Sequence, residues 1–183
     1  GKIGATEIAF SEVHAEYKTR DSKGRADWHT IFRGILFVAD FNKHFQGKTV
    51  VLPDTAQRLL GGLGQRLQSW TPGRDDLVRL EDPEFEREFV VYGSDPIEAR
   101  YVLSPSLMER ILQFRRKTGK RIALSFVGSE VFVALPYTKN LFEPRLFSTL
   151  LDFGTVAHYF EDLQLAMGIV EDLNLNTRIW SKT

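Results

Sequence analysis

The 183-residue sequence contains no cysteine. This absence excludes a disulfide framework, a thiolate nucleophile and a zinc site with cysteine ligands, and it is typical of a reducing compartment. Long apolar runs are also missing: a stretch such as ILFVA, residues 35–39, is far too short to span about 30 Å of hydrocarbon. No signal peptide opens the sequence. Composition alone therefore predicts a globular chain without a membrane span of its own.

The sequence has no excess of either charge, because 24 Lys and Arg balance 24 Asp and Glu. Without a net positive field, nucleic acid is not an expected partner. The four histidines lie at 14, 29, 44 and 158 and show no spacing typical of a metal site, and no serine lies in a Gly-x-Ser-x-Gly elbow. We therefore expect no catalytic residue, no cofactor site and no metal site.

What the sequence does contain is enough apolar material for a sizeable core. Hydrophobic residues make up 43% of the chain, with 14 Phe among them, so we expect a core rich in phenylalanine. The length fits one domain covering residues 1–183. No internal repeat or low-complexity linker divides it.

Extended segments dominate the first third and recur later. Runs of β-branched and aromatic residues, separated by polar or glycine-bearing stretches, predict a long hairpin, a third strand, a middle strand and a second hairpin that turns at Gly128-Ser129. These segments are residues 6–17, 28–41, 47–54, 88–93 and 121–137.

Three helix starts share one device, an oxygen-bearing side chain followed by proline: Asp82-Pro83, Asp95-Pro96 and Ser104-Pro105. The side chain can accept from the first free amides of the helix, and proline at the next position has no N–H to leave unsatisfied. Glu98, three residues after Asp95, has the spacing of a capping box. The acids of this stretch are therefore interpreted as helix caps, not as a catalytic pair.

Two longer helical patterns accompany them. Residues 105–118 place Leu107, Ile111 and Phe114 on one face before Gly119. Residues 147–173 carry a continuous apolar seam, made of Val156, Phe160, Leu163, Met167 and Val170. A weaker pattern follows Asp54. Together the elements predict an α+β fold, a largely antiparallel sheet with hairpins that is covered on one side by helices, the long C-terminal helix foremost.

Two constellations have a functional interpretation beside a structural one. Arg115, Arg116, Lys117, Lys120 and Arg121 could contact an anionic ligand such as a lipid headgroup, or could simply stabilise a helix C-terminus. Glu12, His14 and Glu16 project from one side of a strand and could form a polar site, or a solvated strand face.

Long phrases of the sequence, among them FSEVHAEY, IFRGILFVADFNKHFQGKTVVLPD, RIALSFVGSEVFVALPYTKNLFEP and VEDLNLNTRIW, resemble the C-terminal region of an uncharacterised bacterial membrane-associated family that is sometimes mislabelled galanin-like. The resemblance implies a helical segment and two membrane helices upstream. The first residue is glycine and not methionine, so we expect the chain to be the soluble part excised from a longer, membrane-anchored protein. The family supplies no catalytic residue.

The leading functional hypothesis is a non-enzymatic binding or assembly module at the bacterial inner membrane, on its cytoplasmic side, with a protein partner or the membrane surface as its target. One alternative is a hydrolase or transferase that uses Glu12, His14 and Glu16 or the acids near Tyr92. The other is a lipid-headgroup binding domain that uses the basic residues between 115 and 121.

Overall fold

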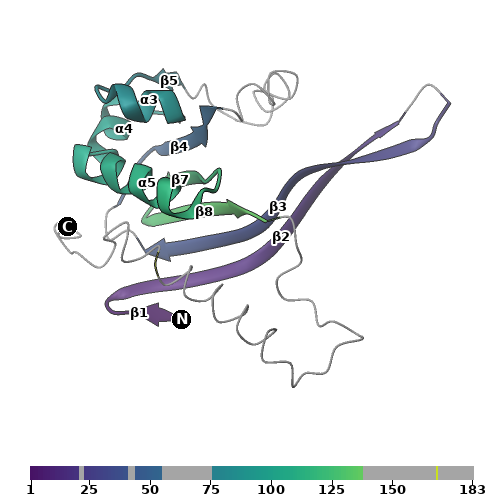
Figure 1. The fold of residues 1–183 in the computed structure, drawn as a ribbon, viewed down its shortest axis with the longest axis horizontal. Coiled ribbons are helices and arrows are strands. Elements are labelled where there is room, and N and C mark those ends of the chain that lie inside the picture. The colour runs from purple at the N-terminus through teal and green to yellow at the C-terminus, as the bar shows by residue number, and fades with distance from the viewer. Residues whose placement is uncertain (21–22, 41–43, 55–75, 138–167, 169–183) are drawn as a thin grey trace.

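The structure is a computed structural model that describes residues 1–20, 23–40, 44–54, 76–137 and 168. Figure 1 shows a body of strands and helices from which one long two-stranded ribbon extends.

The described strands form one eight-stranded sheet in the order β1-β2-β3-β8-β7-β4-β6-β5, and each neighbouring pair is antiparallel. The strands are β1 Lys2–Ile3, β2 Thr6–Arg20, β3 Ala26–Asp40, β4 Lys48–Pro53, β5 Asp76–Val78, β6 Phe89–Gly93, β7 Ala123–Val127 and β8 Glu130–Pro136. The two predicted hairpins are confirmed as β2–β3 and β7–β8, and Gly128 at the second turn has the φ of 61° that glycine adopts readily. The short strands β1 and β5 were not predicted.

Three helices pack beside strands β4 to β8 (Figure 1): α3 Pro83–Glu88, α4 Pro96–Val102 and α5 Pro105–Thr118. Helix α4 contacts β4, β5 and β6, while α3 contacts β6 and α5. The prediction for α5 is confirmed at both ends, since it begins at Pro105 and stops at Gly119, whose φ is 64°. None of the described helices is long and apolar enough to cross a membrane.

The core lies between the helices and one face of the sheet. Strand register places Phe37, Val133, Leu124, Val51 and Val91 in one row across five strands, and each is at most 2% exposed. Directly opposite residues share a face, so the alternation of buried and partly exposed positions along these strands marks the covered face. The largest fully buried side chains include Phe37, Phe85, Phe89, Phe114 and Phe126, which confirms the phenylalanine-rich core.

The predicted α+β class is wrong. Strand accounts for 52% of the described residues and helix for 26%, in three short helices, so the fold is mainly β. The class changes because β2 and β3 run for 15 residues each and include half of the residues, 18–27, that were expected to connect them. The expected C-terminal helix over 147–173 contributes no described element, since this range lies outside the described residues except for Gly168, and the weaker pattern after Asp54 lies outside them as well.

The β2–β3 ribbon is longer than the sheet to which it belongs. The two strands pair at 13 positions, from Ile8↔Ala39 to Arg20↔Ala26, whereas β8 pairs with β3 only from Gly34 to Asp40. From Gly34 outward, the ribbon therefore leaves the body (Figure 1). Eight residues of β3 beyond Gly34 correspond to a reach of roughly 26 Å at about 3.3 Å per residue.

Candidate functional site

The acid-rich stretch after residue 81 is built from helix caps, as predicted. One carboxylate oxygen of Asp82 accepts from the backbone amides of Glu84 and Phe85 at 2.9 and 3.1 Å. Asp95 accepts in the same way from Ile97 and Glu98 at 2.8 and 3.2 Å. These carboxylates satisfy amides that a helix start leaves free, and they do not converge on a common site.

Two details of that prediction are wrong. The side chain of Ser104 makes no capping hydrogen bond to α5 and lies 3.2 Å from the hydroxyl of Ser106 instead. Glu98 does not close a capping box: its two oxygens accept from the backbone amides of Gln46 and Gly47 at 2.9 and 2.7 Å. Glu98 thus joins α4 to the segment that leads into β4.

The segment before β4 is held by Ser94 as well, next to the Glu98 carboxylate. Its hydroxyl accepts from the Lys48 amide at 2.8 Å, and its own amide donates to the Lys48 carbonyl at 3.0 Å. A Cβ on Gly47 would lie 2.5 Å from Ser94 Oγ and 2.7 Å from Glu98 Oε2, so any larger residue would have to displace these two side chains. We call Gly47, Lys48, Ser94 and Glu98 the β4 clamp. It is a structural device that fixes the start of a central strand.

The predicted basic cluster is dispersed. Arg115 and Arg116 form ion pairs with Glu88 and Glu84 of α3. Arg115 also lies 5.6 Å from the centre of the Phe89 ring. These two arginines therefore hold α5 to α3 and are not presented together to an anion.

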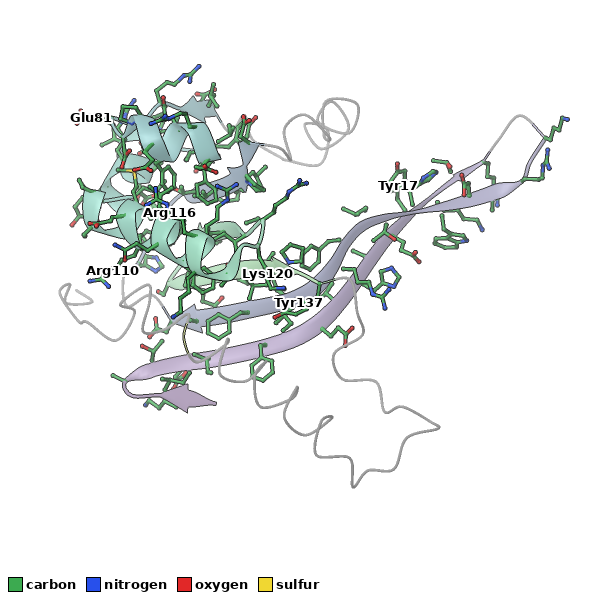
Figure 2. All side chains as sticks on the ribbon, in the orientation of Figure 1. Tyr17, Glu81, Arg110, Arg116, Lys120 and Tyr137 are labelled. Carbon is green, nitrogen blue, oxygen red and sulfur yellow. The ribbon has the colours of Figure 1, made fainter. Side chains whose placement is uncertain are left out.

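The remaining cations of the cluster point to different neighbours. The Lys120 ammonium lies 3.4 Å from the centre of the Tyr137 ring, which is a cation–π contact. Figure 2 labels both residues. Lys117 and Arg121 are exposed. The cluster thus supplies two exposed cations at the end of α5 and no built anion site within the described residues.

The second predicted constellation lies on the ribbon. Glu12, His14 and Glu16 occupy alternate positions of β2 and so share one side of it, as expected. His14 Nε2 is 3.4 Å from a Glu16 carboxylate oxygen and 3.5 Å from Thr30 Oγ1. The His14 and Glu16 side chains are 46% and 36% exposed, so this group sits on an open strand surface. Among the residues described, no three His, Asp or Glu side chains gather closely enough to hold a metal ion.

A hollow in the described residues lies between β5, β6 and α3. Its volume is about 130 Å³, well below the roughly 300 Å³ at which pockets for small-molecule ligands begin. Two carboxylates, Asp54 and Glu86, line it. Glu86 accepts from the Leu80 amide at 2.9 Å and lies 3.8 Å from the Arg79 guanidinium. The hollow is therefore too small for a typical small-molecule substrate.

Sequence reasoning missed one histidine–serine pair. His44 Nδ1 lies 3.3 Å from Ser129 Oγ, although 85 residues separate them along the chain. Both the histidine and the turn that bears the serine are at the surface, and among the described contacts no carboxylate orients the imidazole, as a catalytic triad requires. The pair joins two loops.

Sequence reasoning also missed the surface of the ribbon. On one face, Tyr17 and His29 stack with ring centres 4.9 Å apart, and His29 Nε2 lies 2.9 Å from Thr19 Oγ1 and 3.5 Å from the Asp27 carboxylate. This face is occupied by its own cross-strand contacts. Figure 2 labels Tyr17 on the projecting part.

The opposite face of the ribbon carries Trp28, which is 59% exposed although tryptophan is normally well buried. Ile31, further along β3, is 51% exposed as well. The Lys18 ammonium lies 5.2 Å from the centre of the Trp28 ring. We call the side chains of Lys18, Arg20 and Trp28 the ribbon tip face. It is the best candidate for a functional surface among the described residues.

Comparisons with known proteins give one family and no relative of assigned function. Searches of curated proteins and of solved structures each return no match. A family described as "Protein of unknown function (DUF3137)" matches residues 30–175, which include most of the sheet and all three described helices. The matched residues are well over half of the chain. The protein therefore belongs to the DUF3137 family of proteins of unknown function.

Proposed function

We propose that the protein is a non-enzymatic binding or assembly module of a membrane-tethered bacterial protein, and that the β2–β3 ribbon is its binding element. One observation carries the proposal: the outer half of this hairpin projects beyond the sheet with the side chains of Trp28 and Ile31 exposed. A two-stranded hairpin without a third strand or a covering helix is only marginally stable in water. A marginally stable element with exposed apolar side chains is well suited to contact another surface.

The described polar side chains support a binding role over catalysis. The carboxylates of Asp82, Asp95 and Glu98 are engaged by backbone amides, and Arg115 and Arg116 are engaged by acids. Groups that serve such structural bonds are not available for proton transfer. The 130 Å³ hollow between β5, β6 and α3 adds no substrate pocket.

The resemblance of the sequence to a membrane-associated bacterial family supports the location that we propose. A tether upstream of residue 1 would hold the domain at the cytoplasmic side of the inner membrane, and a projection of roughly 26 Å would extend its reach from that anchor.

Site-specific photocrosslinking in the native host tests the proposal. The full-length gene product would carry a photoreactive phenylalanine in place of Trp28 in one strain and of Ile97 in another. Ile97 is the matched control, because it is 78% exposed and lies on α4 in the body. We expect adducts from position 28 and none from position 97.

Two results would contradict the proposal. Position 28 could give no adduct to protein or lipid, or positions 28 and 97 could react equally, in which case the ribbon would have no special role. Separately, turnover by the purified chain in a broad hydrolase and transferase screen that is lost on mutation of His14 would establish an enzyme in its place.

A further inference from the structure

The ribbon tip face combines a large aromatic side chain with two cations. Strand pairing places Lys18 directly opposite Trp28 and Arg20 directly opposite Ala26, so these four positions share one face. On β2, His14 and Glu16 lie on that face too, and His14 pairs with Arg33 of β3.

A β-bulge lies next to this face. Ala15 pairs with Phe32 and the next residue, Glu16, pairs with Thr30, so Ile31 has no opposite residue on β2. In such a bulge two residues of one strand face one residue of the other, and the strand bends. The ribbon therefore bends between its tip and the body.

The tip also has a net positive charge, although the chain as a whole is neutral. Residues 18–28 contain four cations, Lys18, Arg20, Lys23 and Arg25, and two carboxylates, Asp21 and Asp27, which gives a formal charge of +2. Because the whole chain has a formal charge of zero, the rest carries the opposite excess. A binding partner with complementary charge would therefore be negatively charged.

The edges of the ribbon argue against pairing with a strand of another protein or of a second copy. Natural sheets protect open edges with lysines, other charges and bulges, and the outer half of this ribbon has all three devices. The available surface is therefore a face and not an edge.

We infer that the ribbon tip face binds an anionic lipid bilayer, with the Trp28 indole in the interfacial region and the cations Lys18 and Arg20 against the headgroups. Tryptophan prefers this interface because its ring is apolar and its N–H is polar. Lys and Arg near an anionic leaflet each favour binding. The inference rests on the proposed function and specifies the partner of the same element.

The test uses the chain with Trp70 and Trp180 replaced by phenylalanine, so that Trp28 is the only fluorescent indole. The probes are vesicles of phosphatidylcholine with phosphatidylglycerol, and vesicles of phosphatidylcholine alone. We expect a blue shift of Trp28 emission, and quenching by lipids brominated near the headgroup end of the acyl chain, only with the anionic vesicles. The shift should weaken as salt is raised.

Vesicle sedimentation of single variants, made in the chain that keeps Trp70 and Trp180, separates the contributions of Trp28 and of each cation to membrane binding. Trp28→Ser should lower the partition coefficient at least about tenfold, and Lys18→Gln or Arg20→Gln about fivefold each. Ile97→Ser, the body control, should leave it unchanged, as should Arg121→Gln at the end of α5. Circular dichroism of each variant confirms that the sheet is intact.

Each contrary outcome identifies a different error. Anionic vesicle binding that is lost with Arg121→Gln and kept with Trp28→Ser would overturn the inference in favour of the α5 cations. Absence of vesicle binding, together with a protein or nucleic-acid adduct from position 28 in the crosslinking experiment, would overturn the inference and leave the proposed function standing. No adduct of any kind at position 28 would overturn the proposed function itself.

Discussion

The Glu98 carboxylate of the β4 clamp offers the sharpest test of the packing. Glu98→Ala removes two hydrogen bonds from backbone amides to a charged acceptor, at 2.9 Å for Gln46 and 2.7 Å for Gly47. Such bonds contribute about 1.5–3 kcal/mol each. Because Gln46 is exposed, water replaces its partner and that bond counts at the low end. We expect a loss of about 3–4.5 kcal/mol in the free energy of unfolding.

Glu98→Gln keeps the shape and distinguishes the two bonds. Its amide oxygen can accept from one backbone N–H, while its NH₂ group faces the other donor, so we expect roughly half the loss seen with alanine. The control is Glu109→Ala, on the exposed side of α5, which should change stability by less than about 0.5 kcal/mol. Urea unfolding at constant m-value gives the free energies.

A double-mutant cycle extends the test to Gly47. Gly47→Ala alone brings a Cβ within 2.7 Å of Glu98 Oε2 and 2.5 Å of Ser94 Oγ. Truncating Glu98 and Ser94 to alanine removes both obstacles, so Gly47→Ala should be less destabilising in that background. Additive free energies, or amide exchange at Gln46 and Gly47 that is unchanged by Glu98→Ala, would refute the clamp.

Three further predictions follow from single contacts. Asp82→Ala should cost about 1 kcal/mol in chemical denaturation, whereas Ser104→Ala, which removes no capping bond, should cost less than about 0.5 kcal/mol; equal losses would contradict the cap geometry. Gly34→Ala should destabilise by at least about 2 kcal/mol, because its Cβ would lie 1.9 Å from the Leu135 carbonyl oxygen, and an unchanged melting temperature would rule out that close approach. Phe37→Ala should cost about 3–5 kcal/mol, since the side chain is fully buried in the middle of the sheet; a smaller loss in calorimetry would place the core elsewhere.

Local chemistry predicted the helix starts well because each depends on neighbours in sequence. Asp82 and Asp95 find their amides two and three residues away, so spacing alone suffices. Glu98 had the same local spacing, yet its partners lie 51 and 52 residues away, where two amides of an incoming strand offer a better donor pair than one cap amide. Only the tertiary fold decides between such competing donors.

The functional surface was hidden for a related reason. The polar, glycine-bearing composition between Tyr17 and Trp28 is typical of a turn, but cross-strand pairing extends the strands to Arg20 and Ala26. The exposure of Trp28 could not be predicted, because aromatic residues in a strand usually indicate burial. Likewise, the cations after residue 114 formed a patch in sequence, and the acids that neutralise Arg115 and Arg116 come from a different helix.

Strand β3 belongs to both the sheet and the ribbon without interruption, and this continuity has a mechanical consequence. Its inner half is hydrogen-bonded to β2 on one side and to β8 on the other. The projecting half therefore continues a strand that the sheet holds in place, and no hinge separates it from the body. A force applied near Trp28 is transmitted along β3, past the bulge at Ala15/Glu16, to the hydrogen bonds between β3 and β8. Binding at the ribbon tip would therefore exert a force on the strands that contribute to the core.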